Sequence, residues 1–102
     1  MEYILKPSQF FLEQVEELSE EAARVVEDKL RLAKINPYRF KKLEGYDLFL
    51  FRMRFEDNRK EKRVVYIVDK PFIKVICIID RDSGYKTLRK YLKQSCLCQG
   101  QV

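Results

Sequence analysis

An apolar run that carries two arginines, residues 47–55, constrains the fold of this chain more than any other stretch. It reads DLFLFRMRF, and a nearly continuous run of large apolar residues is typical of a central strand covered on both faces. Because side chains alternate across a strand, Phe49, Phe51 and Phe55 fall on one face and Arg52 and Arg54 on the other. The phenylalanine face is predicted to be core. The cationic end of the other face predicts exposure to solvent or to an anion.

Two more strand-like runs follow, at residues 63–68 and 72–80. The wholly polar stretch 56–62 predicts a loop after the first strand, and Asp69-Lys70-Pro71 predicts a turn before the third. We therefore expect an antiparallel meander of three strands.

The placement of arginines along these runs predicts a cationic cluster. Simple alternation puts one set of third-strand residues on a common face, namely Ile73, Val75, Cys77, Ile79 and Arg81. Arg63 opens the second strand. If these faces coincide with that of Arg52 and Arg54, four guanidinium groups gather at one edge of the sheet.

The N-terminal third predicts a short strand and two helices. Residues 3–5 are β-prone. Ser8 and Ser19 are each followed by apolar residues at helical spacing, so each is expected to cap a helix, the second of which runs to about Ile35. Asn36-Pro37 then stops it. Two helices joined by a minimal turn form a hairpin that can cover one face of a sheet.

Together these elements predict one α+β domain over residues 1–102, in the order β-α-α-β-β-β. The sheet is expected to contain about four antiparallel strands, with the helical hairpin packed on one face. Leu88 and Leu92 predict a short C-terminal helix over residues 86–93, and residues 94–102 are expected to form a flexible tail. A chain of 102 residues, 46% of them hydrophobic, has the size and composition of one folded domain.

Neither a membrane segment nor a metal site is predicted. No apolar run approaches the roughly 20 residues that span a bilayer, and no secretion signal opens the chain, so the expected location is the cytoplasm. The cysteines are Cys77, Cys96 and Cys98, an odd number that matches no disulfide framework. Because the chain has no histidine and no second cysteine pair to complete a tetrahedral shell, we expect no metal or other cofactor.

Charge is unevenly distributed along the chain. Residues 1–35 carry five basic and eight acidic side chains, whereas residues 36–102 carry 16 basic and eight acidic ones. A basic surface attracts nucleic-acid phosphate or an acidic protein segment, and its sign alone does not choose between them.

Five features of the basic part resemble the RelE/ParE superfamily of toxin–antitoxin toxins, and within it the RelE-like mRNA endonucleases. The family pattern is a KL-x-G turn, two basic residues separated by one, an arginine before an apolar-apolar-Tyr sequence, an arginine that ends the next strand, and a tyrosine soon after. In this chain the corresponding residues are Lys42-Leu43-Glu44-Gly45, Arg52 with Arg54, Arg63-Val64-Val65-Tyr66, Arg81 and Tyr85. The resemblance extends to the order of the predicted elements.

The resemblance implies a ribosome-dependent mRNA endonuclease that inhibits translation and is silenced by a cognate antitoxin, which we expect to be acidic. The implied catalytic residues are Arg52, Arg54, Arg63, Arg81 and Tyr85. Candidates for RNA binding are Lys42, Arg59, Lys62 and Lys86. Cleavage by the 2′-hydroxyl of RNA needs a base, cations that stabilise the phosphorane and an acid for the leaving oxygen. Arginine suits the second role because its planar fork binds phosphate through two hydrogen bonds.

Two departures from the family pattern leave the mechanism open. The paired basic positions are often lysine in bacterial members, and arginine, with a pKa above about 12, is a poor base. Either Tyr85 accepts the proton, or catalysis depends on orientation and charge. The loop 56–62 is also expected to be longer than the hairpin usual in the family.

Two other functions compete with the nuclease. One is a RelE/ParE-like protein that binds without cutting, either a gyrase inhibitor or a degenerate toxin that only binds its antitoxin. The other is a small basic RNA-binding domain.

Overall fold

Both predicted serine caps begin a helix. The computed structural model of the protein describes residues 2–43 and 50–80. The Ser8 hydroxyl accepts a hydrogen bond from the Phe11 N–H (3.0 Å), and the Ser19 hydroxyl accepts one from the Ala22 N–H (3.1 Å). These bonds satisfy amides that a first helical turn leaves without an internal partner. The elements are β1 (Ile4–Pro7), α1 (Gln9–Glu16), α2 (Glu20–Ile35), a 3₁₀ turn (Pro37–Arg39), β2 (Lys41–Lys42), β3 (Leu50–Asp57), β4 (Lys60–Asp69) and β5 (Phe72–Asp80).

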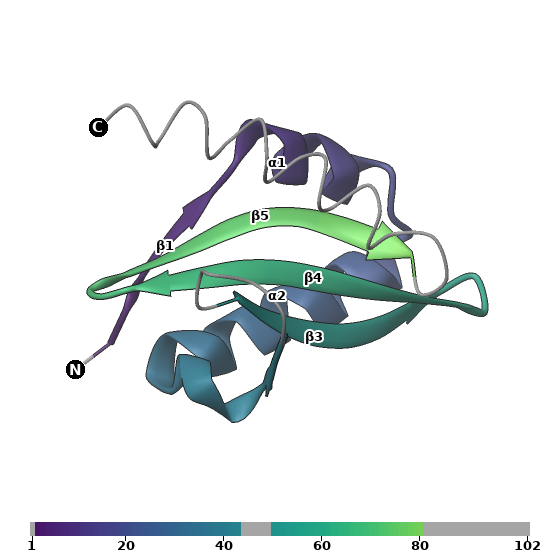
Figure 1. The fold of residues 1–102 in the computed structure, drawn as a ribbon. Helices are drawn as coiled ribbons and strands as arrows, with labels where there is room; N and C mark the ends of the chain where they lie inside the picture. The colour runs from purple at the N-terminus through teal and green to yellow at the C-terminus, as the bar shows by residue number, and fades with distance from the viewer. Residues whose placement is uncertain (1, 44–49, 81–102) are drawn as a thin grey trace.

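The two helices cover the same face of the sheet. α1 packs against β5 and α2 against β3, as Figure 1 shows. Their inward side chains, Phe11, Ala22, Val26, Leu30 and Ala33, join one apolar cluster with the sheet. The sheet contributes Phe51, Met53, Phe55, Val64, Tyr66, Val68, Ile73, Val75 and Ile78 to this cluster. The predicted helical layer and the core role of Phe51 and Phe55 are therefore confirmed, while Phe49 lies outside the described residues.

The sheet has five strands in the order β1-β5-β4-β3-β2, one more than predicted. The antiparallel meander of β3, β4 and β5 is confirmed. The prediction of a wholly antiparallel sheet is wrong at one edge, because β1 pairs with β5 in parallel. The added strand is β2, at the other edge, where the sequence shows only two lysines in a basic connector. Both differences concern pairings that local sequence does not specify.

A β-bulge in β5 changes which of its side chains share a face. Val65 pairs with Cys77 and Tyr66 pairs with Val75, so Ile76 is an extra residue. Ile73 and Val75 consequently pack with the helices, whereas Cys77 and Ile79 belong to a second apolar cluster on the opposite face. The prediction of one common face is wrong here, because simple alternation assumes a strand without a bulge.

A two-residue turn joins β3 to β4, and the predicted loop over residues 56–62 is wrong. β3 extends to Asp57, β4 begins at Lys60, and these two residues pair across the strands. The turn residues Asn58 and Arg59 both have positive φ, 51° and 66°, as a type I′ hairpin requires. A wholly polar stretch can therefore be the end of a hairpin, here with one pair of opposite charge, Asp57 across from Lys60.

The predicted turn before β5 is confirmed at Lys70-Pro71. The predicted C-terminal helix over residues 86–93 and the tail 94–102 lie outside the described residues. Within residues 2–43 and 50–80, no helix is both long enough and apolar enough to span a bilayer.

Candidate functional site

Three of the predicted arginines lie on the sheet face opposite the helices. Arg54 is directly across from Arg63 in the β3–β4 register, and Arg52 is across from Val65. Residues directly across an antiparallel pair point to the same side. Val65 belongs to the apolar cluster on the face away from the helices, with Leu43, Leu50, Ile76, Cys77 and Ile79. The register therefore brings Arg52, Arg54 and Arg63 together, and we call this surface the arginine face.

Two of the three arginines are buried. Arg52 is 7% exposed and Arg63 is 8% exposed, whereas Arg54 is exposed. Arg63 has Ile79 directly across from it on β5. Electrostatic interactions become stronger where water is excluded. A phosphate that reaches these two groups would therefore be bound more strongly than at arginines fully surrounded by water.

Glu61 forms an ion pair with Arg63. The Arg63 Nη2 donates to Glu61 Oε2 at 3.0 Å, and the two side chains are 10% and 28% exposed. Residues two apart on a strand lie on the same face, so Glu61 belongs to the arginine face. A buried charge requires a partner of this kind. The two-residue spacing of Glu61 and Arg63 is compatible with this ion pair. The sequence alone does not distinguish Glu61 from the other charged residues of the surface.

Lys29 links helix α2 to the strand that carries Arg52 and Arg54. Its ammonium donates a hydrogen bond to the backbone carbonyl of Arg54. The contact crosses 25 residues of sequence. It restrains the backbone of β3 at Arg54. This restraint favours a fixed position of the Arg54 side chain on the arginine face.

The lysines of β2 point in opposite directions. Lys41 is directly across from Arg52, and Lys42 is across from Phe51, so Lys41 shares the arginine face while Lys42 lies on the helix side. Sequence reasoning chose Lys42 and missed Lys41, because β2 and its register were not foreseen. Lys62 also lies on the helix side, across from Phe55. Arg59 stands at the exposed tip of the β3–β4 hairpin.

Three of the predicted site residues lie outside the described residues. They are Arg81, Tyr85 and Lys86. The last described residue, Asp80, ends β5 and pairs with Lys62, one position from the pair of Arg63 with Ile79.

The three guanidinium groups of the arginine face can bind and orient phosphate but cannot act as a base. Each guanidinium carries five N–H donors and no acceptor, and it stays protonated at every relevant pH. Arg52, Arg54 and Arg63 can therefore hold a phosphodiester and stabilise the negative charge that develops on it. Proton abstraction has to come from another group.

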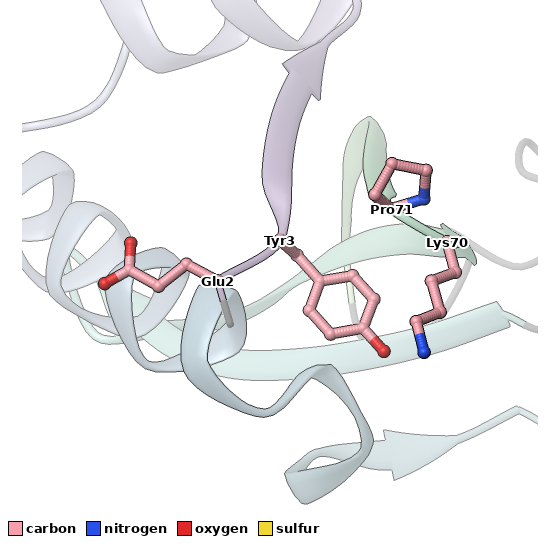
Figure 2. Close-up of a pocket in the computed structure, with 4 residues that line it drawn as sticks. All are labelled: Glu2, Tyr3, Lys70 and Pro71. Carbon is pink, nitrogen blue, oxygen red and sulfur yellow. The ribbon is translucent and has the colours of Figure 1, made fainter.

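A cavity of about 180 Å³ lies at the far end of β4 from Arg63. Figure 2 shows four of its lining residues, Glu2, Tyr3, Lys70 and Pro71, from the start of β1 and the β4–β5 turn. A side-chain hydrogen bond with Tyr3 raises the pKa of the neighbouring Tyr38 phenol, and burial adds to the effect. Six residues of strand, about 20 Å, separate Arg63 from Asp69 beside this turn, so the cavity is distinct from the arginine face.

Comparison with solved structures identifies the fold. A double arginine-to-alanine mutant of the E. coli toxin RelE in the free state has a TM-score of 0.73 and 19% identity, over 92% of this chain and 98% of that chain. The intact E. coli RelBE toxin–antitoxin complex gives a TM-score of 0.68 and 19% identity, over 78% and 98% of the two chains. The archaeal RelE–RelB complex from Pyrococcus horikoshii OT3 gives a TM-score of 0.60 and 22% identity, over 80% of this chain and 98% of that chain.

Sequence comparison adds no relative to these. No protein-family model matches the chain, and no curated protein sequence matches it. The structural agreement nonetheless spans nearly the whole of each RelE chain. At an identity of about one fifth, this agreement concerns the architecture, and the chain therefore has the fold of the RelE toxins.

Proposed function

We propose that the protein is the toxin of a type II toxin–antitoxin system and that it inhibits translation by cleaving mRNA on the ribosome. The observation that carries the proposal is the β3–β4 register, which gathers Arg52, Arg54 and Arg63 on one face of a RelE fold. A structural role alone gives no reason to gather three arginines on one face, where two of them are directly across from each other. Binding of a phosphodiester does.

The proposed chemistry is attack of an RNA 2′-hydroxyl on the adjacent phosphate, which forms a 2′,3′-cyclic phosphate and breaks the bond to the 5′-oxygen of the next nucleotide, which leaves with a proton taken from water. Arg52, Arg54 and Arg63 bind the scissile group and stabilise the phosphorane, with Arg81 contributing a further cation. Tyr85 accepts the proton, because a phenolate is favoured among cations. Lys62, Lys86 and Arg59 are proposed to contact flanking RNA or the ribosome, together with Lys41, which takes the place of Lys42 because it shares the arginine face.

A cognate antitoxin is the proposed protein partner. Two of the structural neighbours are complexes of a RelE toxin with its antitoxin RelB. For this chain we propose an acidic segment that folds over the arginine face, since opposite charge steers such a segment there and ordering occurs on binding. Its binding would block access of RNA to the same face.

The test is cleavage of mRNA on purified, programmed ribosomes. The wild type is expected to cut in a translation-dependent manner, and Arg63→Ala is expected to lower the rate roughly 10²- to 10³-fold, as the loss of a group that stabilises transition-state charge does. The double variant Arg81→Ala, Tyr85→Ala should be inactive. Arg24→Ala, which removes an exposed arginine of α2, is the control and should keep full activity. A wild type that cuts no better than the double variant would contradict the nuclease proposal.

A second candidate function is a toxin that binds without cutting. It is favoured by arginine at both paired positions, 52 and 54, because arginine does not act as a base. The gyrase branch is tested by DNA supercoiling with purified gyrase, where the nuclease proposal expects no inhibition. Growth arrest without mRNA cleavage would support this second function.

A further inference from the structure

Charged side chains form two adjacent rungs on the arginine face. Arg54 is directly across from Arg63, and Glu56 is directly across from Glu61, one step closer to the hairpin turn. Like charges are thus opposed across the strands, and unlike charges alternate along each strand. Like charges directly opposite one another destabilise a sheet. The carboxylates of Glu56 and Glu61 therefore have to offset the repulsion between Arg54 and Arg63.

Glu61 is the carboxylate that pairs with Arg63. Glu61 Oε2 accepts a hydrogen bond from Arg63 Nη2 at 3.0 Å, where the Arg63 side chain is only 10% exposed. A charge-assisted hydrogen bond in such a place is strong and directional. The bond engages the Nη2 end of the guanidinium and so fixes the plane of the group.

We propose that Glu61 is a positioning residue that holds the Arg63 guanidinium in the orientation that binds the scissile phosphate. Without Glu61, the Arg63 guanidinium loses the hydrogen bond that fixes its plane beside Arg54. The inference rests on the proposed nuclease function and adds a residue to its machinery. Glu61 acts through Arg63 and does not itself touch RNA.

The sign of the effect separates positioning from simple electrostatics. A carboxylate on a cationic face repels RNA, so removing one strengthens RNA attraction, which lowers KM and leaves kcat unchanged. Loss of positioning has the opposite consequence, since misplacing a group that acts in the transition state lowers kcat. Glu56 is the matched control: it carries the same charge on the same rung and is directly across from Glu61.

The experiment measures kcat and KM for ribosome-bound mRNA with four variants. Glu61→Gln, which has nearly the same shape as the wild-type side chain, is expected to lower kcat about 10- to 100-fold, while Glu56→Gln stays within about twofold. Glu61→Asp keeps the charge and should recover part of the loss. In the fourth, Glu61→Gln combined with Arg63→Ala, activity should equal that of Arg63→Ala alone, because the two residues act as a unit.

Each other outcome overturns a specific claim. A cleaving wild type in which Glu61→Gln behaves like Glu56→Gln, or in which the losses of Glu61→Gln and Arg63→Ala add, removes the role of Glu61 and leaves the nuclease intact. A wild type that cuts nothing overturns the proposed function and this inference with it. Thermal unfolding of every variant shows whether a loss of activity comes from misfolding. If Glu61→Gln misfolds, the activity recovered by Glu61→Asp decides whether Glu61 positions Arg63.

Discussion

At the scale of single residues, the fold buries a phenol and a thiol, those of Tyr66 and Cys77, in its two apolar clusters. Tyr66 is fully buried on the helix side, where its hydroxyl donates to the Pro37 carbonyl at 2.6 Å and its ring stacks on Phe51. Cys77 is buried on the opposite side. Burial raises the pKa of the Tyr66 phenol, and it raises the pKa of the Cys77 thiol to about 12. Both groups remain neutral where the unfolded chain ionises.

This difference predicts a loss of stability in alkali. An unfolded cysteine has a pKa of about 8.5, so above that pH the unfolded state releases a proton that folded Cys77 keeps until about pH 12. The free energy of unfolding should therefore fall as pH rises above about 8.5, by up to about 1.4 kcal/mol per pH unit from this group. Urea denaturation with reductant between pH 7 and 10 measures it.

The control for this prediction is Cys77→Ala. Its unfolding free energy is lower at neutral pH, because a small cavity replaces the thiol, but it should decline less steeply between pH 8.5 and 10. Parallel curves for the wild type and the variant would rule out Cys77 as the source.

At the scale of elements, α1 depends on β5 for its stability. The helix has eight residues, and helices shorter than about 12 residues are marginal on their own. Gln14 substitutes for a neighbouring strand: its amide donates to the Ile78 carbonyl at 2.8 Å and accepts from the Ile78 N–H at 2.7 Å. Ser8 adds a hydrogen bond to the Ile76 carbonyl at 2.5 Å. These contacts anchor the helix beside the β-bulge of β5.

We expect Gln14→Ala to lower the free energy of unfolding by about 1–3 kcal/mol, because it leaves both backbone groups of a partly buried residue without partners. Gln9→Ala, on the exposed part of the same helix, should change it by less than about 0.5 kcal/mol. Chemical denaturation measures both, and faster hydrogen exchange at the Ile78 amide should accompany the loss. An equal, small effect of the two substitutions would show that apolar packing alone holds α1.

At the scale of the whole molecule, charge is divided between two layers. The helical layer comes from the acidic part of the sequence, residues 1–35, and β2, β3, β4 and β5 come from the basic part. The sheet presents Lys41, Arg52, Arg54 and Arg63 on the side away from the acidic helices. This arrangement favours approach of an anionic polymer to the arginine face and disfavours its approach to the helices.

The division predicts different roles for two adjacent lysines. Lys41→Ala should weaken binding to the programmed ribosome and reduce the slope of log K against log salt by about 1, as the loss of one phosphate contact does. Lys42→Ala, which removes the same charge from the helix side, should leave the slope nearly unchanged. Equilibrium binding over a range of salt concentrations measures both slopes. Equal slopes would place no RNA phosphate near Lys41.

Local chemistry explains what the sequence by itself determined. Serine caps, apolar periodicity and strand alternation each depend on residues a few positions apart, so they fixed both helices, the meander and the separation of Phe51 and Phe55 from Arg52 and Arg54. Alternation left open whether Arg63 shares a face with the other two arginines, and the β3–β4 register decides that it does.

The remaining features were decided by contacts between distant residues. Parallel pairing of β1 with β5 joins residues 68 apart, and β2 exists only where it finds the edge of β3. The bulge at Ile76 reverses alternation halfway along β5 and leaves no local signature. Register alone distinguishes Lys41 from Lys42 and pairs Arg54 with Arg63. Sequence thus determined which residues are cationic, and tertiary pairing decided which of them meet, because a register shift of one residue moves every side chain to the other face.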